Sequence, residues 1–172
     1  MFHGRLGNTS KNPYFQGRVL FPRLKIAIKI PPIGEADVSF LADTGADRTL
    51  IMPSDFFRFG ITLAQLTRKT SMNGVGGQGD GFLEEALVTF SEPGAGLHVY
   101  QMDLVIAAPN QAIMQCPSLL GRDIMNRWCL TVDGPRQTVS AKIASSDNFL
   151  KFTGKVKENA PLVGVAPPLY RD

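Results

Sequence analysis

The sequence predicts an all-β, barrel-like domain with about seven to nine short strands and two small helices. Apolar and polar residues alternate with period two along several segments, which is typical of strands with one buried face. Glycine and proline interrupt these segments at short intervals and predict turns between them. With 172 residues, of which 44% are hydrophobic and 19% charged, the chain is long enough to form one domain with a substantial core.

The first half of the chain shows the alternation most clearly. The run Leu24–Ile30 is rich in β-branched residues and predicts a half-buried strand, and the turn residues Pro31–Gly34 follow it. A glycine-rich stretch, Asn73–Gly81, lies between two alternating runs and predicts a long hairpin. The elements expected in this half are strands at 24–30, 36–42 and 50–52, a helix that starts at Pro53 and ends at Gly60, and hairpin strands at 67–72 and 81–90.

The second half continues the pattern up to residue 143. Alternate residues such as Tyr100, Leu104 and Ile106 share one face of a long expected strand. The turn residues Asp133–Pro135 separate the last two strands. The elements expected in this half are a strand at 97–107, the end of a strand at 119–120, a helix at 122–128, and strands at 129–132 and 137–143.

The two ends of the chain carry weaker signals. Residues 1–18 are polar and contain several glycines, so we expect a flexible arm with little structure of its own. Beyond Ser146 the alternation fades into a segment that contains proline and glycine. We therefore divide the chain into an N-terminal arm (1–18), one folded domain (19–146) and a C-terminal tail (147–172).

Composition argues against several classes of function. The formal net charge is +3 and the 18 basic residues are scattered, which does not suggest a nucleic-acid-binding protein. No apolar run approaches the roughly 18 residues of a membrane helix and no secretory signal is evident, so we expect no membrane partner and a cytoplasmic location. The histidines His3 and His98 and the cysteines Cys116 and Cys129 are too few and too dispersed to predict a metal site. No cofactor is expected.

The motif Asp43-Thr44-Gly45 is the strongest candidate for a chemical role. It lies between two apolar runs, so Asp43 is expected in a tight turn at the mouth of a sheet. Thr44 can hydrogen-bond through its hydroxyl, and Gly45 permits a sharp backbone path. An acid held near a second acid can activate water against an amide while the second acid supplies a proton. The chain has one such motif and hence half of such a site, and taken alone the motif is more simply interpreted as an ordinary turn.

The stretch Gly74–Gly79 has the spacing G-x-G-x-x-G, which also occurs in dinucleotide-binding proteins. Nucleotide binding requires this motif between a strand and a helix, whereas the following segment, Phe82–Phe90, alternates like a strand. A plain hairpin tip is therefore the better interpretation. A glycine-rich tip also suits a flap that closes over a substrate, because glycine permits the backbone change.

Two other hydrolytic chemistries lack support. The chain has no G-x-S-x-G motif of the kind that presents a nucleophilic serine. Neither Cys116 nor Cys129 has a histidine at a suggestive spacing, so both are expected to be small apolar residues in or near the core.

Three motifs in one order resemble the retropepsin-like aspartic proteases, the family that comprises the retroviral proteases and their cellular relatives. They are the active-site sequence Leu41–Asp47, the flap sequence Gly74–Gly77 and the glycine-arginine-helix sequence Leu119–Asp123. The resemblance spans the chain from Leu24 to Val132, with fitting order and separations.

This resemblance implies a closed, mostly antiparallel barrel with one or two short helices that works as a homodimer on polypeptide substrates. Each subunit would contribute Asp43 to a catalytic pair, Thr44 would hydrogen-bond across the two-fold axis, and Gly45 would offer its backbone to the substrate. Arg122 would pair with Asp47 beneath the cleft. The implied site residues are Asp43, Thr44 and Gly45 for catalysis, Ala46, Asp47, Gly74, Val75, Gly76 and Gly77 for substrate binding and the flap, and Gly121, Arg122 and Asp123 for structural support.

In such a dimer the two aspartates would share one proton, because two carboxylates a few ångströms apart cannot both ionise cheaply. We therefore expect activity at acidic to mildly acidic pH. The chain continues past the point where a retroviral protease ends, and we expect its hairpin Cys129–Ile143 to supply the dimer sheet. Two alternatives stay open: a dimeric peptide-binding module without activity, and an assembly domain that dimerises without binding peptides. Asp43 favours the enzyme, since folding alone does not require an acid at a two-fold axis.

Overall fold

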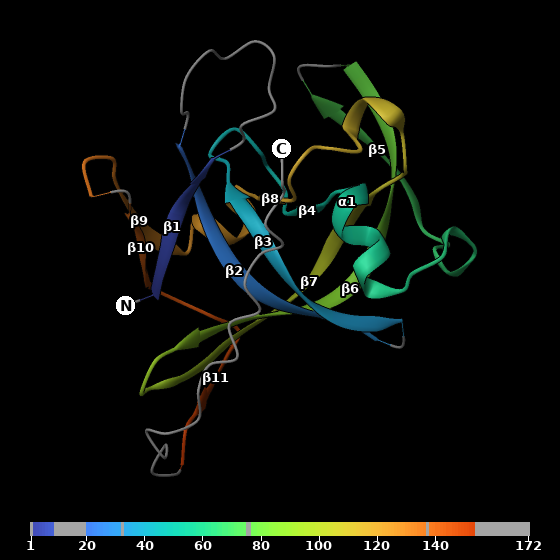
Figure 1. Ribbon diagram of the computed structural model, residues 1–172. Coiled ribbons are helices and arrows are strands. Elements are labelled where there is room, and N and C mark those ends of the chain that lie inside the picture. Colours follow the sequence, from blue (N-terminus) through green and yellow to red (C-terminus); the bar gives the residue numbers. More distant parts are fainter. Residues whose placement is uncertain (1, 9–19, 32, 75–76, 137, 154–172) are drawn as a thin grey trace.

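The computed structural model describes residues 2–8, 20–31, 33–74, 77–136 and 138–153, and this part of the chain is mostly β-structure (Figure 1). The strands are β1 (Phe2–Asn8), β2 (Leu20–Ile30), β3 (Gly34–Ala42), β4 (Leu50–Ile51), β5 (Lys69–Gly74), β6 (Gly77–Glu92), β7 (Gly96–Ala107), β8 (Leu119–Leu120), β9 (Trp128–Asp133), β10 (Thr138–Ile143) and β11 (Asn148–Lys151). The helices are α1 (Pro53–Phe56) and α2 (Arg122–Met125), and the 3-10 turns are η1 (Phe57–Phe59), η2 (Leu63–Gln65) and η3 (Gln111–Ile113). Among the described residues, no helix has the length and apolar character needed to cross a membrane.

Six of the strands close into a barrel. Hydrogen-bonded neighbours run from β6 through β7, β4, β8 and β3 to β2, and β2 pairs with β6 to complete the ring. In the closing pair, Ile28 on β2 lies opposite Val88 on β6. The β3–β8 and β4–β7 pairs are parallel and the other four are antiparallel. The closed, mostly antiparallel barrel that the motifs imply is confirmed.

Alternation decides which side chains enter the barrel. On β2, Leu24, Ile26, Ile28 and Ile30 are at most 2% exposed, whereas Lys29 points to solvent. Burying one such side chain is worth about 1.5–3 kcal/mol, so the inward face of each strand carries much of the driving force for closure. The largest fully buried side chains of the described part are Tyr100, Phe40, Phe56, Phe90, Leu24, Ile26, Ile28, Ile30, Ile51, Leu104, Ile106 and Leu120.

A short helical segment after β4 packs against the barrel. Pro53 occupies the first turn of α1, where its fixed φ and missing N–H do no harm. Phe56 and Phe59 from this segment are buried in the core. Gly60 ends η1 in the left-handed conformation, with φ of 67°. The predicted start at Pro53 and end at Gly60 are confirmed.

The second helix is shorter than the sequence predicts. The prediction extends it over Arg122–Trp128, but α2 ends at Met125 and Trp128 is the first residue of β9. The Trp128 ring packs edge-on against Phe90, with centroids 4.4 Å apart, and its Nε1–H donates to the Tyr100 hydroxyl at 2.7 Å. Because this packing fixes the indole in the core, the backbone at Trp128 is extended and the prediction is wrong there.

Parts of both chain ends form strands, whereas the sequence predicts only an arm and a tail there. Phe2–Asn8 forms β1, which pairs with both β2 and β10, and the remainder of the expected arm lies outside the described residues. Asn148–Lys151, within the expected tail, forms β11 and pairs with β7. All four β11 side chains are exposed, so this strand shows no alternation for a sequence pattern to reveal.

Candidate active site

Strand β3 delivers Asp43 to a tight turn at its end. The Asp43 N–H donates to the carbonyl of Leu120 on β8 (3.1 Å), and the Asp43 carbonyl accepts from the Ala46 N–H (3.1 Å). The side chain is half-buried, and its Oδ1 accepts from the Gly45 N–H at 2.8 Å. The tight turn that the sequence predicts is present, and its own backbone orients the carboxylate.

Gly45 leaves room for this arrangement. A Cβ at this position would lie 3.1 Å from Oδ1 of Asp43, so any side chain would press on the carboxylate. Thr44 and Asp47 are exposed, whereas Ala46 is half-buried. The Thr44 side chain thus lies on the surface of the chain, next to the half-buried acid.

Three contacts join helix α2 to this turn. The guanidinium of Arg122 forms an ion pair with the carboxylate of Asp47. The Arg122 N–H donates to the Ala46 carbonyl (2.8 Å), and the Asp123 N–H donates to the Asp47 carbonyl (3.2 Å). The structure thus brings Arg122 to the partner that the resemblance implies, and the two backbone bonds hold the loop as well.

Thr49 is a part of this support that the sequence analysis does not find. Its backbone N–H and its Oγ1–H donate to the two carboxylate oxygens of Asp123, each at 2.7 Å. Its Oγ1 also accepts from the Gly121 N–H at 3.1 Å, and the residue is completely buried. The sequence signal was weak, because a threonine after a turn is ordinary and its partner lies 74 positions away.

Gly121 allows the two loops to approach each other. A Cβ on Gly121 would lie 2.3 Å from the carbonyl carbon of Arg48 and 2.7 Å from the Thr49 nitrogen, closer than real atoms come. The φ of Gly121 is −91°, so the requirement for glycine comes from this contact and not from backbone strain. The glycine of the glycine-arginine-helix sequence is therefore explained by packing against the loop that follows Asp43.

A second buried polar group, also missed from the sequence, lies between the loop and α1. The Ser118 hydroxyl donates to Oδ2 of Asp55 (2.7 Å) and accepts from the Met52 N–H (3.0 Å). The Ser118 carbonyl accepts from the Leu41 N–H at 2.8 Å. Ser118 therefore fixes the strand that leads into Asp43 to the helical segment that follows it.

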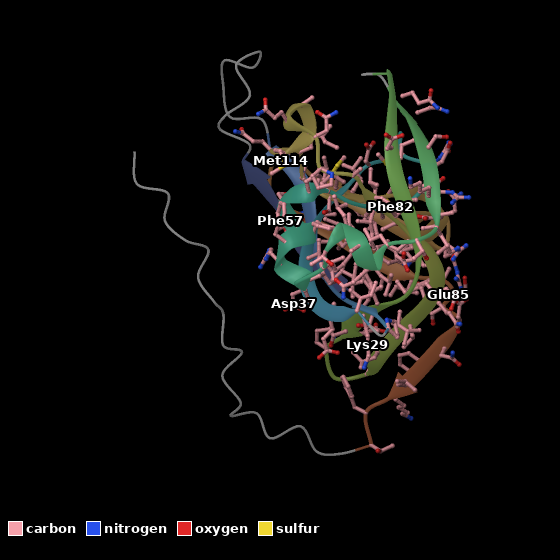
Figure 2. All side chains as sticks on the ribbon, turned by 90° about the vertical axis from the view of Figure 1, so that its right-hand side faces the viewer. Lys29, Asp37, Phe57, Phe82, Glu85 and Met114 are labelled. Atoms are coloured by element: carbon pink, nitrogen blue, oxygen red, sulfur yellow. The ribbon has the colours of Figure 1, made fainter. Side chains whose placement is uncertain are left out.

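The glycine-rich hairpin is formed by β5 and β6, with Gly74 opposite Gly77 at the last described pair. Val75 and Gly76, the expected flap tip, lie outside the described residues. Gly77 has φ of 103°, a conformation that side chains disfavour. At the root of the hairpin, Phe82 packs against the core while Glu85 points outward (Figure 2).

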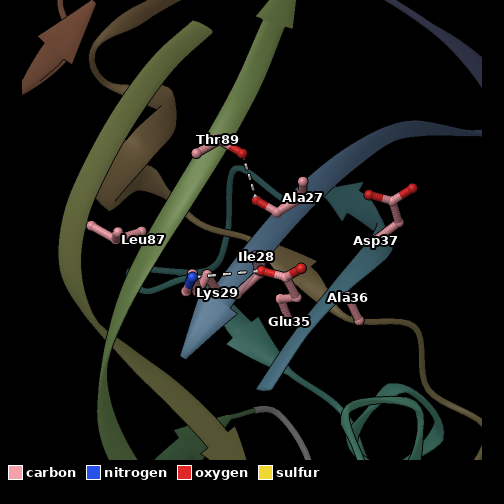
Figure 3. Close-up of a pocket in the computed structure, with 8 residues that line it drawn as sticks. All are labelled: Ala27, Ile28, Lys29, Glu35, Ala36, Asp37, Leu87 and Thr89. Carbon is pink, nitrogen blue, oxygen red and sulfur yellow. Dashed lines mark hydrogen bonds and ion pairs between the residues drawn. The ribbon is translucent and has the colours of Figure 1, made fainter. Parts of the chain in front are cut away.

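A cavity of about 430 Å³ lies away from this site, on the outer face of β3, β2 and β6 (Figure 3). Its lining includes Asp37, which lies near the opposite end of β3 from Asp43, together with Lys29 and Glu35. Lys29 and Glu35 form a loose ion pair of 3.8 Å across this cavity. The cavity therefore takes no part in the geometry around Asp43.

One of the two cysteines departs from the expectation that both lie in or near the core. Both are free, Cys116 is half-buried and Cys129 is exposed on β9. Cys129 faces outward because its neighbour Trp128 takes the inward position on the strand, so the core assignment of Cys129 is wrong. Within the described part of the chain, no group of three or more His, Cys, Asp or Glu side chains could hold a metal ion.

Comparison with known proteins decides the family. Residues 31–124 match the model of a family described as aspartyl protease. The chain belongs to this aspartyl protease family. The family predicted from the three motifs is thereby confirmed. The matched range of this family member contains the Asp43 turn, the flap sequence and Gly121–Asp123, whereas β9, β10 and β11 lie beyond it.

Among the solved structures similar to this chain is a retropepsin-like aspartic protease from Rickettsia conorii, known from a crystal structure. The sequences are 14% identical, the match covers 81% of this chain and 98% of that chain, and the TM-score is 0.42. A comparison with curated protein sequences found no match.

Proposed function

We propose that this aspartyl protease family member is an active endopeptidase, and that it works as a homodimer with one Asp43 from each chain. The observation that supports this most is the Asp43 turn. Its carboxylate is half-buried and oriented by the Gly45 N–H at 2.8 Å, and the loop is held by Arg122 and Thr49. Because the chain has a single Asp-Thr-Gly motif, a second copy must supply the second acid.

The chemistry requires two acids in different protonation states. The ionised Asp43 takes a proton from water as the water oxygen attacks the carbonyl carbon of the peptide bond, and the protonated Asp43 gives its proton to the carbonyl oxygen. The resulting gem-diol then returns one hydroxyl proton to the second carboxylate while the first delivers its proton to the amide nitrogen. The C–N bond breaks, the products are a carboxylic acid and an amine, and the pair regains its single shared proton.

The proposed two-fold axis passes between two Asp43 turns. Thr44 is exposed beside the acid, which suits a hydrogen bond to the partner turn. Among the strands of the described residues, β9 is the last in the sheet order and pairs only with β10, and its Val132 is 50% exposed. An open edge with an exposed apolar side chain supports our hypothesis that the hairpin Cys129–Ile143 supplies the dimer sheet.

The substrate in this proposal is an extended polypeptide. The flap hairpin, Gly45 and Asp47 would offer backbone groups to it, in the manner of an added strand. A cleft shared by two chains would be complete only in the dimer, and the 430 Å³ cavity of the single chain is not part of it. The expected cytoplasmic location remains a prediction.

A peptide digest tests the proposal. A diverse peptide mixture is incubated with the protein across about pH 3–7 and read by mass spectrometry, at a concentration where a dimer mass is confirmed. Wild type should cleave, Asp43→Asn should not, and Asp37→Asn, which removes a carboxylate from the far end of β3, should cleave like wild type. Peptide binding without cleavage by a confirmed wild-type dimer would contradict the enzyme and support a peptide-binding module.

A further inference from the structure

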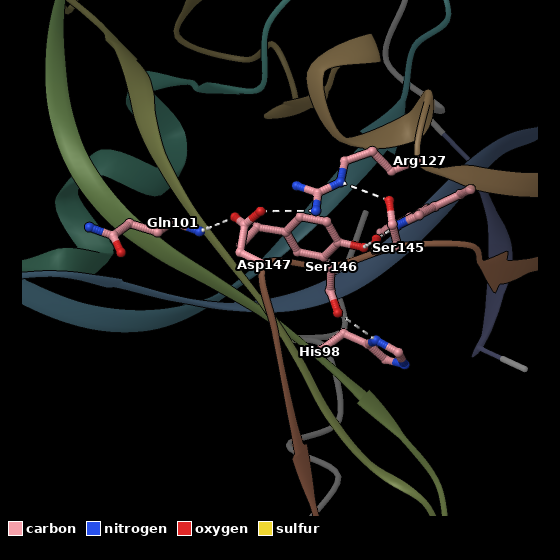
Figure 4. Close-up of polar contacts among 8 residues, drawn as sticks. His98, Gln101, Arg127, Ser145, Ser146 and Asp147 are labelled. Carbon is pink, nitrogen blue, oxygen red and sulfur yellow. Dashed lines mark hydrogen bonds and ion pairs between the residues drawn. The ribbon is translucent and has the colours of Figure 1, made fainter.

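A segment beyond the family match is firmly attached to the rest of the molecule. We name residues Ala144–Lys151 the C-terminal strap; they connect β10 to β11 and include β11 itself. The strap crosses from the end of the β9–β10 hairpin to the outer part of β7 (Figure 4). Its position next to Arg127, two residues after α2, makes it a neighbour of the helix that supports Asp43.

Arg127 is the residue to which the strap attaches. Its guanidinium contacts Oδ1 of Asp147 at 2.9 Å, and its Nε–H donates to the Ser145 hydroxyl at 3.2 Å. Its carbonyl accepts from the N–H groups of Ala144 (2.9 Å) and Ser145 (3.3 Å). The guanidinium also lies 4.6 Å from the centroid of the Tyr100 ring. The strap therefore contacts both the backbone and the side chain of Arg127.

Asp147 connects Arg127 to strand β7 of the barrel. Its Oδ2 accepts from the backbone N–H of Gln101 on β7 (2.8 Å), and its own N–H donates to the Val99 carbonyl (3.0 Å). The hydrogen bond from Arg127, followed by the bond from the Gln101 amide, lowers the pKa of the Asp147 carboxyl below its ordinary value. Asp147 thus bridges Arg127 and a strand of the closed barrel.

The part of β7 that pairs with β11 leaves space for it. A Cβ on Gly96 would lie 2.3 Å from the Leu150 carbonyl oxygen and 2.8 Å from the Phe149 ring, so glycine is required where β11 pairs with β7. The His98 ring lies 4.6 Å from the Phe149 ring and hydrogen-bonds the Ser146 hydroxyl at 3.1 Å. These contacts attach the strap to β7 as part of the folded structure.

Helix α2 needs support from outside itself. It has one turn, and helices this short are not stable alone. At its start it is bound to the Asp43 loop through Arg122 and Asp123. Just past its end the Arg127 N–H donates to the Ile124 carbonyl (2.9 Å), so the residue held by the strap is hydrogen-bonded directly to the helix.

We propose that Arg127 and Asp147 are positioning residues: through them the C-terminal strap holds α2, and α2 holds the Asp43 loop in its reactive geometry. This inference rests on the proposed function only for its effect on catalysis. Its structural half, that loosening Asp147 loosens the contacts between α2 and the loop, can be measured without any activity.

Amide hydrogen exchange of the full-length protein tests the structural half. In Asp147→Ala, the amides of Thr49, Arg122 and Asp123, which bond the loop and α2 to each other, should exchange about tenfold faster than in wild type. Amides of the β2–β3 pair should keep their wild-type rates. Equal acceleration at both places would show that Asp147 only stabilises the fold as a whole, and unchanged rates at the loop would also overturn the inference.

Steady-state peptide cleavage tests the catalytic half. Asp147→Ala should lower kcat about tenfold with little change in KM, since small displacements near a reacting group are costly. Asp147→Asn should lie between it and wild type, because its amide oxygen can still accept from Gln101. The matched control Glu35→Gln removes an exposed carboxylate from the Lys29 pair and should change nothing. Unchanged kcat in Asp147→Ala would overturn the inference, whereas an inactive wild type would instead refute the proposed function and leave the exchange result to judge the strap.

Discussion

Thr49 and Asp123 form a two-point contact that joins the Asp43 loop to α2. The backbone N–H and the hydroxyl of Thr49 each donate to one carboxylate oxygen of Asp123 at 2.7 Å. Asp123 also accepts from the Ile124 N–H (2.9 Å), so one carboxylate serves three donors. This contact holds together two segments that lie far apart in the sequence.

Thr49→Val should therefore be strongly destabilising for an isosteric change. It removes the hydroxyl and leaves Oδ1 of Asp123 and the buried Gly121 N–H with one partner fewer, so we expect a loss of about 1–3 kcal/mol in the free energy of unfolding. Urea denaturation measures it. Thr89→Val is the matched control: its hydroxyl bonds the Ala27 carbonyl at 3.2 Å on the outer face, and it should cost less than about 0.5 kcal/mol. Equal losses in the two variants would contradict this account.

Gly121→Ala should disrupt the site through a backbone clash. The new Cβ would lie 2.3 Å from the Arg48 carbonyl carbon, and backbone cannot move aside as a side chain can. We expect a loss of about 3 kcal/mol or more in the free energy of unfolding. Gly134→Ala, where nothing lies within 4 Å of the added Cβ, is the control. A stable Gly121→Ala protein with wild-type cleavage would show that the two loops are not in close contact.

Arg122→Lys should separate activity from stability. The side chains of Arg122 and Asp47 are 51% and 80% exposed, so their ion pair contributes at most about 1 kcal/mol to stability. Lysine cannot reproduce the guanidinium geometry beneath the proposed cleft, and we expect kcat/KM to fall about tenfold or more. Arg68→Lys changes a comparable surface pair with Asp103, outside the proposed dimer hairpin, and serves as control. A melting temperature that falls in proportion to activity would mean that the pair acts only through folding.

The pair of Arg68 and Asp103 predicts a pH dependence of stability. Arg68 binds Asp103 through two bonds of 2.8 and 3.1 Å, and this hydrogen bonding lowers the pKa of the Asp103 carboxyl. Because the folded pKa lies below the unfolded one, the stabilisation is complete above the unfolded value and disappears as pH falls through the folded value. The melting temperature of Asp103→Asn should be lower than that of wild type at neutral pH, and the gap should close below about pH 4. A difference in melting temperature that persists or widens in acid would contradict this prediction.

The sequence predicted most of the barrel because its strands carry a simple signal. Leu24, Ile26, Ile28 and Ile30 alternate with two lysines and an alanine, and one buried face is enough to produce that pattern. Strand β11 has no buried face, and the backbone at Trp128 is decided by a ring contact with Phe90, so neither could be found from local pattern.

The residues of the candidate site also divide into those that the sequence predicted and those that it did not. Asp43, Gly45 and the Arg122–Asp47 pair followed from motifs of five and seven residues whose chemistry is local or known from the family. Thr49, Ser118 and Asp147 did not, because each acquires its role from partners distant in sequence, and threonine, serine and aspartate are common in turns.

The central claim is that two Asp43 side chains from two chains form one active site. Wild type and Asp43→Asn are mixed at equal amounts, subunit exchange is confirmed by mass, and cleavage is measured at constant total protein. If both aspartates are needed, about a quarter of the dimers carry two of them, so activity should fall to about a quarter of that of pure wild type. Activity at half of the wild-type value would show that each chain works on its own and would contradict the account.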